Sequence, residues 1–565
     1  MNLKEYFQDI TRQLGEEKHN LSDLPMPNKP KYFNWVKDVF HPLNVKAYGK
    51  NIALIWKNGG IVKTFSFDDV YKISNQLVNF LRRRDIDKEN VIYTMLPLIP
   101  ENWFTFLASI TGGNIIMPTA TNLVSKDLTY RFNSLFPDVI IAHSDYAESI
   151  DESEKLIGKK IKLKIIIGGD KEGWTNFNQV DKESTNCEPA HTKSDDPLLY
   201  FFTSGTTGLP KIVVHSHYTY PVGHLSTLSW LGCKRGDIHY NISSPGWAKF
   251  AWSSFFAPWN AGATILANLV DKFNPKDQLS TMESLKVTTF CGSPTVIRML
   301  IQEDLRKYNL SLRSCCAAGE PLNPEVIHKW SKETGVTIRD GYGQTETTAL
   351  IANMPGNKLK PGSMGKSTFL YDIGIFDDMG NELPPLEEGV ICVKLDRKKS
   401  NGLFLEYLSD QDRTAQSFKH NLYYTGDKAY KDEDGYIWFI GRNDDVIKAS
   451  AYRIGPFEVE SVLIEHQDII ESAVVASPHD LRGYTVKAFI ILNSNANPNE
   501  KLAKDIFSLC ESKLAKYKIP RIIEFRESLP KTISGKIRRV ELRAEEANAR
   551  IKESINEHEY FHPKY

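Results

Sequence analysis

The stretch YFFTSGTTGLPKIVVHSH, residues 200–217, decides how the rest of the chain is interpreted. One apolar run enters it and another leaves it, which predicts two strands joined by a loop. The loop, residues 203–211, holds four hydroxyl side chains, two glycines and Lys211. Backbone N–H groups, hydroxyls and a lysine can hold phosphate oxygens, and glycines let the backbone approach a bulky anion. A flexible surface hairpin is the alternative that composition alone leaves open.

The loop is not a Walker A motif. Lys211 follows Pro210 and precedes Ile212, so the pattern G-x-x-x-x-G-K-[ST] is absent. An ordinary P-loop kinase or ATPase is therefore disfavoured.

Length and composition restrict the class of protein. A chain of 565 residues is too long for one core, so two or more domains are expected. Lys plus Arg and Asp plus Glu both number 70, which disfavours a nucleic-acid binder held by a general basic surface. No run approaches the roughly 18 apolar residues of a membrane span. The start lacks an apolar signal core, and the seven cysteines form no C-x-x-C pair, so we expect a cytoplasmic protein with free thiols.

Two patterns divide the chain. From about Lys50 to Pro385, short apolar runs such as NIALIW, VIYTML, DVIIAHS and LKIIIGG predict buried parallel strands. After Asp427, the segment DKAYKDEDGYIWFIGR predicts a hairpin, and PFEVESVLIEHQ and KLAKDIFSLCESKLAKY predict helices among the strands DIIESAVVAS, VKAFIIL and RIIEF. We expect an α/β fold: a large N-terminal domain of layered sheets and helices in several subdomains, residues 1–443, and a small α+β domain, residues 444–565, which the family resemblance described below implies is mobile.

Three further segments indicate the function of this loop. They are DGYGQTE at 340–346, YTGD at 424–427 running into the Gly-Arg pair at 441–442, and PKTISGK at 530–536. In this order, and together with residues 203–211, they resemble the adenylate-forming superfamily, over roughly residues 47–543. The segment YRIGPFEVES is typical of its branch of medium-chain acyl-CoA synthetases and acetyl-CoA synthetases. The resemblance implies an AMP-forming acyl-CoA ligase, which converts ATP, an acid and CoA to acyl-CoA, AMP and pyrophosphate through an acyl-adenylate.

In this family the substrate's own carboxylate is the nucleophile, so the protein supplies positioning and charge neutralisation. The resemblance implies that Glu346 binds Mg²⁺, that Asp427 accepts both ribose hydroxyls, and that Lys536 reaches the α-phosphate and acyl carboxylate during adenylation only. Outside the motifs, Glu346 and Lys536 would be interpreted as solvated surface charges. The implied catalytic residues are Lys536, Glu346, Thr345 and Lys211. The implied ATP and AMP site comprises Thr203, Ser204, Gly205, Thr206, Thr207, Gly208, Lys211, Gly319, Glu320, Pro321, Asp340, Gly341, Tyr342, Gly343, Gln344, Thr345, Asp427, Arg442 and Lys536.

The family's C-terminal domain rotates between the half-reactions about a residue that corresponds to Asp444, which also fits a plain polar turn. The resemblance implies a CoA site made of Ser450, Ala451, Tyr452, Arg453 and Arg482. Ala451 departs from the family pattern, which usually has glycine there, and its methyl group puts the CoA contact at that position in doubt.

The acyl-binding region is expected to comprise Trp247, Ala248, Lys249, Ala318 and Gly343. Gly343 stands where acetate-specific relatives carry tryptophan, which opens space for several methylenes worth ~0.8 kcal/mol each. We therefore expect acids of about four to eight carbons. If the Lys249 side chain lies near this region, it would favour a substrate with a hydroxylated tail. Its long aliphatic side chain favours instead an orientation in which the ammonium group reaches solvent.

Other functions stay open at this point. A ligase for a hydroxylated acid such as 4-hydroxybutyrate is one alternative, and a stand-alone adenylating enzyme that loads a carrier protein is another. A luciferase-like oxygenase would share the first half-reaction. A non-catalytic nucleotide-binding relative is disfavoured because Lys211, Glu346, Asp427 and Lys536 are all present. The expected partners are a small carboxylic acid, ATP and CoA, with no nucleic acid and no membrane span, and no oligomeric state is predicted.

Overall fold

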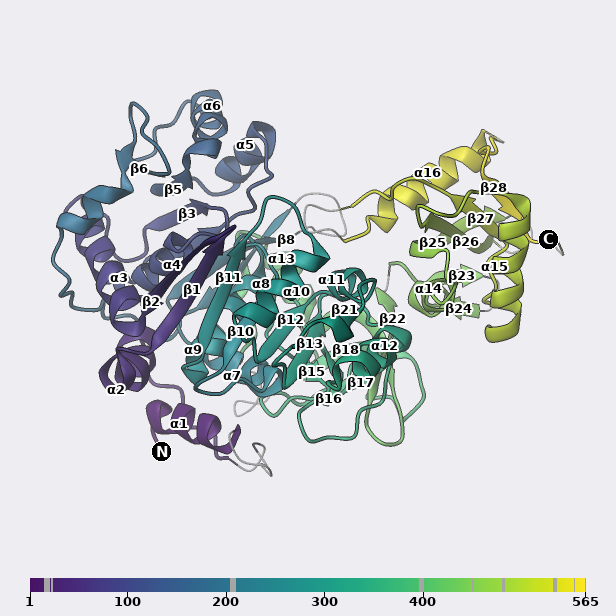
Figure 1. Ribbon diagram of the computed structural model, residues 1–565, viewed down its shortest axis with the longest axis horizontal. Helices are drawn as coiled ribbons and strands as arrows, with labels where there is room; N and C mark the ends of the chain where they lie inside the picture. The colour runs from purple at the N-terminus through teal and green to yellow at the C-terminus, as the bar shows by residue number, and fades with distance from the viewer. Residues whose placement is uncertain are drawn as a thin grey trace.

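The computed structural model describes residues 1–14, 21, 24–203, 210–395, 401–442, 444–449, 452–479, 483–531, 536–552 and 554–563. A large unit holds the N-terminal part of the chain, and a smaller unit at the C-terminal end stands beside it (Figure 1). The predicted division at 443/444 falls between strand β22 (Ile437–Arg442) and strand β23 (Ile447–Ala449).

A nine-stranded sheet crosses the large unit in the order β16-β15-β14-β13-β12-β10-β11-β1-β2. The six strands from β14 to β1 run parallel, whereas β15, β16 and β2 are antiparallel additions at the two edges. The strands are β1 (Ile52–Asn58), β2 (Ile61–Ser66), β10 (Ile238–Asn241), β11 (Thr264–Leu269), β12 (Thr289–Gly292), β13 (Ser314–Ala318), β14 (Ile338–Tyr342), β15 (Ile351–Ala352) and β16 (Lys366–Ser367).

An eight-stranded sheet has the order β19-β9-β8-β4-β3-β5-β6-β7 and is parallel from β8 to β7. The predicted apolar runs VIYTML, DVIIAHS and LKIIIGG form its strands β3, β5 and β6, as expected. The strands are β3 (Val91–Met95), β4 (Ile115–Pro118), β5 (Val139–His143), β6 (Leu163–Ile167), β7 (Thr175–Asn176), β8 (Pro197–Thr203), β9 (Lys211–Ser216) and β19 (Glu406–Tyr407). The loop of interest joins β8 to the antiparallel β9, and Thr203 pairs with Lys211 at its base.

A third, antiparallel sheet lies toward the small unit. It consists of β17 (Ile373–Phe376), β18 (Gly389–Lys394), β20 (Phe418–Lys419), β21 (Leu422–Lys431) and β22. Strands β21 and β22 form the predicted hairpin, with Gly435 in its turn at a φ of +82°. That backbone conformation suits glycine because it has no side chain to clash.

Buried helices of the large unit belong to its main core, which also takes side chains from both large sheets. Helix α7 is buried along its whole length, which explains why its apolar residues are not confined to one stripe. The helices are α1 (Leu3–Leu14), α2 (Lys46–Tyr48), α3 (Phe67–Arg82), α4 (Glu101–Gly112), α5 (Ser125–Ser134), α6 (Ala147–Ile157), α7 (Thr219–Leu231), α8 (Ala248–Ala251), α9 (Ala257–Ala261), α10 (Pro275–Ser284), α11 (Pro294–Leu300), α12 (Pro324–Thr334) and α13 (Gln411–Ser417). Two π-helical segments, η2 (Val36–Val45) and η5 (Trp252–Phe256), continue into α2 and α9.

The small unit has a core of its own, built on a four-stranded sheet in the order β25-β26-β27-β28. Its elements are the hairpin of β23 and β24 (Tyr452–Ile454), the strands β25 (Ile469–His479), β26 (Gly483–Leu492), β27 (Ile522–Phe525) and β28 (Glu559–Phe561), and the helices α14 (Pro456–Leu463), α15 (Glu500–Lys513) and α16 (Arg539–Ile551). The predicted helices and strands of this part are all present. Helix α16 and strand β28 were not predicted. Among the residues that the structure describes, no helix has the length and apolar character needed to cross a bilayer.

Candidate active site

Two predicted nucleotide-binding segments lie at one edge of the nine-stranded sheet. Ala318 ends β13, and the predicted residues Gly319, Glu320 and Pro321 follow it directly. Asp340, Gly341 and Tyr342 end the neighbouring strand β14, where Ala318 and Gly341 are partners in register. The carboxyl ends of parallel strands are the usual place for a ligand in such sheets. The expected adenine-binding segments therefore lie side by side.

Asp427 forms the centre of a polar cluster. It lies opposite Arg442 in the β21–β22 hairpin, is 5% exposed, and its Oδ1 lies 3.9 Å from the Arg442 Nε. Its Oδ2 accepts hydrogen bonds from the Tyr342 hydroxyl at 2.6 Å and the Gln344 Nε2 at 2.7 Å. Burial raises the pKa of the Asp427 carboxyl, and Arg442 opposes that shift. Because two protein donors use Oδ2, Oδ1 is the oxygen that can accept from a ribose diol.

Glu346 and Lys211 form the second cluster. Glu346 is 8% exposed, and its Oε1 lies 3.3 Å from the Lys211 Nζ and accepts from the Tyr407 hydroxyl at 2.8 Å. The Lys211 Nζ also lies 3.7 Å from the centroid of the Tyr407 ring. Within the described residues no hydrogen bond or ion pair uses Oε2 of Glu346. A carboxylate oxygen of this kind fits a hard cation such as Mg²⁺.

Sequence reasoning missed Tyr407, His215 and Tyr423. The His215 Nε2 contacts the Thr345 carbonyl oxygen at 2.7 Å, so that nitrogen is the donor, and the Tyr423 hydroxyl donates to Gln344 Oε1 at 2.8 Å. Burial lowers the pKa of His215 to about 4, so the ring is neutral at pH 7. These residues hold the segment from Gln344 to Glu346 in place. Residue spacing could not predict these contacts, because each of the three residues lies far from that segment in the sequence.

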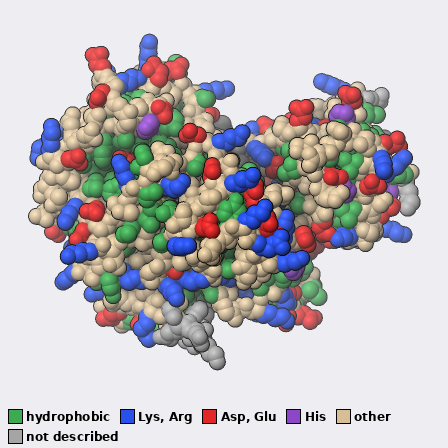
Figure 2. All heavy atoms as spheres, viewed as in Figure 1, with side chains coloured by type: hydrophobic (Ala, Val, Ile, Leu, Met, Phe, Trp, Pro, Cys, Tyr) green, Lys and Arg blue, Asp and Glu red, His purple; other side chains and the backbone are tan. Residues whose placement is uncertain are grey.

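Lys536 belongs to the small unit and interacts electrostatically with the clusters around Asp427 and Glu346. It is exposed to solvent, and it interacts electrostatically with Arg442, Glu320, Asp427 and Glu346. The small unit also touches the large one where the Asn323 Nδ2 donates to the Ser461 carbonyl at 2.9 Å. On the face shown in Figure 2, basic side chains gather near the junction of the two units. Lys536 therefore lies within electrostatic range of both clusters.

Several predicted residues lie outside the described part of the chain. They are Ser204, Gly205, Thr206, Thr207 and Gly208 of the phosphate loop and Ser450, Ala451 and Arg482 of the CoA site. Of the remaining CoA residues, Tyr452 is 50% exposed and stacks on Tyr517 with ring centroids 4.2 Å apart. Arg453 is exposed beside it in β24. Asp444 is exposed in a turn closed by the Asp445 N–H, which donates to the Arg442 carbonyl at 2.9 Å.

The structure corrects two expectations about the acyl-binding region. Lys249 does not run outward, because its half-buried side chain donates to the Ala318 carbonyl at 3.4 Å. The space beside Gly343 is not empty either. An ideal Cβ at Gly343 would lie 2.2 Å from the Thr348 carbonyl oxygen and 2.5 Å from Cη2 of Trp252. Trp252 therefore supplies, from another part of the chain, an indole beside the position where Gly343 lacks one.

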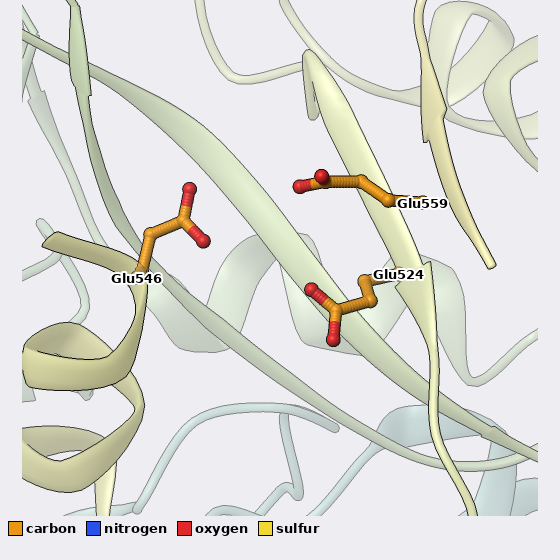
Figure 3. Close-up of side chains that lie close together, drawn as sticks. All are labelled: Glu524, Glu546 and Glu559. Atoms are coloured by element: carbon orange, nitrogen blue, oxygen red, sulfur yellow. The ribbon is translucent and has the colours of Figure 1, made fainter. Parts of the chain in front are cut away.

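A group of three carboxylates elsewhere has the geometry of a metal site. Glu524 of β27, Glu546 of α16 and Glu559 of β28 point toward one another in the small unit (Figure 3). However, the Lys487 Nζ lies 2.6 Å from a carboxylate oxygen of each. Its ammonium group takes the place that a cation would need. Burial alone would raise the pKa of Glu546, but Lys487 brings it below its usual value. This cluster is structural.

Comparisons with known proteins agree with this geometry. Residues 43–408 match the family model described as AMP-binding enzyme, and residues 458–536 match the AMP-binding enzyme C-terminal domain. The chain is 47% identical to 4-hydroxybutyrate–CoA ligase 1 of Metallosphaera sedula over 94% of this chain and 93% of that one. It is 40% identical to human mitochondrial acyl-coenzyme A synthetase ACSM3 over 92% and 90% of the two chains.

A solved structure with a bound acyl-AMP molecule has a similar architecture. The anthranilate CoA ligase AuaEII in complex with anthranoyl-AMP has a TM-score of 0.85 and 30% identity, covering 94% of this chain and all of that one. The large and small units, the strand-edge site and these relatives lead to one conclusion. The chain belongs to the AMP-binding enzyme family and is an AMP-forming acid–CoA ligase that uses ATP and CoA.

Proposed function

We propose that the enzyme activates a carboxylic acid of about four to eight carbons, with Mg²⁺ held by Glu346 and with Lys536 active in the first half-reaction. The observation that carries this proposal is the convergence of Glu346, Asp427 and Lys536. The three residues come from separate motifs. Tyr342 and Gln344, from the motif of Glu346, donate to the Asp427 carboxylate at 2.6 and 2.7 Å, and Lys536 interacts electrostatically with both carboxylates.

The first half-reaction joins two anions, so charge neutralisation is its main requirement. An oxygen of the acid's carboxylate bonds to the α-phosphorus of ATP, and the bond to the pyrophosphate oxygen breaks. Lys536 lowers the repulsion between the two anions as a point charge. Glu346 offers Oε2 to Mg²⁺, which would screen the phosphate charge. Asp427 fixes the ribose through Oδ1, so that the α-phosphate is held in position.

The second half-reaction requires Lys536 to give way to CoA. The CoA sulfur bonds to the acyl carbon, the bond to AMP breaks, and the thiol proton is released. We place the pivot at Asp444, which is exposed in the turn that joins β22 to the small unit. Tyr452, Arg453 and the neighbouring residues of their loop would then guide CoA. The seven cysteines are all free, which supports a reducing compartment such as the cytoplasm.

Two observations bear on the acid. The Trp252 indole beside Gly343 limits the depth available to an alkyl chain, which favours the short end of the range of four to eight carbons. A hydroxylated acid is a second candidate, because Lys249 turns inward and because the 47% identical relative is named a ligase for 4-hydroxybutyrate.

The test is a screen of straight-chain acids from two to ten carbons, with and without hydroxyl groups, following both AMP and acyl-CoA. We expect kcat/KM to be highest between four and eight carbons and low for acetate. A maximum at acetate, or activity only with aromatic acids, would contradict the proposed substrate class.

A further inference from the structure

Lys249 is a cation whose described contacts leave it under-satisfied. Its ammonium group has three donors, but the described residues provide one hydrogen-bond acceptor, the Ala318 carbonyl at 3.4 Å. No carboxylate in the described part of the chain forms an ion pair with it within 4.0 Å. Burial lowers the pKa of Lys249, and the Cys291 thiol and the Glu320 carboxylate oppose that shift electrostatically without an ion pair to Lys249. A partly buried ammonium with so few acceptors is costly unless something else supplies them.

The position of Lys249 shows where such a partner would lie. Lys249 and Trp252 are three residues apart where α8 continues into η5, so their side chains project from neighbouring positions on one side of the helix. Trp252 reaches Gly343, just beyond the end of β14, and Lys249 reaches Ala318, at the end of the adjacent strand β13. The apolar indole and the cation thus flank the same two strand ends.

We propose that Lys249 binds an oxygen at the far end of the substrate, so that the enzyme selects short acids carrying a terminal hydroxyl or carboxylate group over plain alkyl acids. This inference rests on the proposed function and specifies its substrate. The Trp252 indole packs against the methylenes, and the Lys249 ammonium donates to the terminal oxygen. A methyl group at that point would displace water from the Lys249 ammonium group. It would offer no hydrogen-bond acceptor in place of that water.

The experiment compares three acids of matched length on each protein. 4-Hydroxybutyrate and succinate carry a terminal oxygen, and pentanoate has a methyl group where 4-hydroxybutyrate has its hydroxyl. We expect the wild type to have a higher kcat/KM for at least one oxygen-bearing acid than for pentanoate. Lys249→Met should lower that ratio about ten- to hundredfold, the usual worth of a hydrogen bond to a charged group. Whichever of the two acids shows the effect identifies the terminal group as hydroxyl or carboxylate.

Using a ratio removes the effect of a general loss of activity, and Lys249→Gln provides a second variant that keeps a donor. We expect Lys249→Gln to retain more of the preference than Lys249→Met. Lys276→Met, at an exposed lysine of α10, is the matched control and should leave the ratio unchanged. An unchanged ratio in Lys249→Met, or an equal loss on all three acids, would overturn the inference. ATP–pyrophosphate exchange by the wild type with butyrate distinguishes failure of this inference from failure of the proposed function. The absence of exchange would refute the proposed function itself.

Discussion

Replacing Trp252 by leucine should lengthen the acids that the enzyme accepts. The Trp252 side chain is buried, and the edge of its six-membered ring faces Gly343. Leucine removes that ring and leaves room for about two methylenes. At ~0.8 kcal/mol per buried methylene, the gain is ~1.6 kcal/mol, or roughly fifteenfold in relative kcat/KM. We therefore expect the ratio of hexanoate to butyrate to rise by about that factor.

The substitution also has a cost in stability. The Trp252 Nε1 donates to the Tyr220 hydroxyl at 3.0 Å, and leucine removes this bond together with part of the packing. The loss should stay below the ~3–5 kcal/mol typical of replacing tryptophan by alanine. Trp259→Leu is the matched control, since Trp259 is also buried and donates to the Ala53 carbonyl at 3.2 Å. The reasoning is refuted if both variants are folded and Trp252→Leu leaves the hexanoate-to-butyrate ratio at its wild-type value.

Four other substitutions, at three positions, test separate parts of the structure. Gly343→Ala should lower stability by about 1–3 kcal/mol and lower kcat/KM for all acids in proportion, because its methyl group would meet the Thr348 carbonyl. Gly343→Trp should do the same more severely, and a folded variant that prefers acetate would show that the space is open after all. Asp444→Pro fixes φ near −65° and should preserve ATP–pyrophosphate exchange while thioester formation falls, whereas normal turnover with CoA would remove Asp444 as the pivot. Lys487→Met removes the cation shared by three buried carboxylates and leaves them only Arg526 and Arg550 as basic partners in the described part of the chain. It should cost up to about 3–5 kcal/mol in the free energy of unfolding measured by urea denaturation, and a variant as stable as the wild type would show that the carboxylates are protonated.

The sequence was sufficient to predict those strands and turns that have a recognisable local pattern of residues. Apolar runs bounded by turn residues predicted β3, β5 and β6, and the Asp434-Gly435 pair predicted the hairpin of β21 and β22. Strand β28 escaped prediction because it has three residues and is defined by its pairing with β27. Helix α16 escaped because its sequence is largely charged, and just two of its residues are buried.

Only those residues of the candidate site that belong to the sequence motifs could be predicted. The structure gives Asp427 and Glu346 polar partners, Tyr342 and Tyr407, and their roles in binding ribose and Mg²⁺ stay predictions. Contacts between distant segments could not be predicted, because spacing does not indicate which residue fills a given space. Trp252 beside Gly343 is such a case, and so is the inward course of Lys249. Both depend on how α8 and η5 pack against the ends of β13 and β14.

The most direct test of the mechanism is to measure the two half-reactions of Lys536→Ala separately. Lys536 interacts electrostatically with Asp427 and Glu346, and the proposed mechanism assigns it to adenylation alone. We expect ATP–pyrophosphate exchange with butyrate to be abolished, while acyl-CoA formation from preformed butyryl-adenylate proceeds at the wild-type rate. An equal loss in both half-reactions would contradict the assignment of Lys536 to the first step alone.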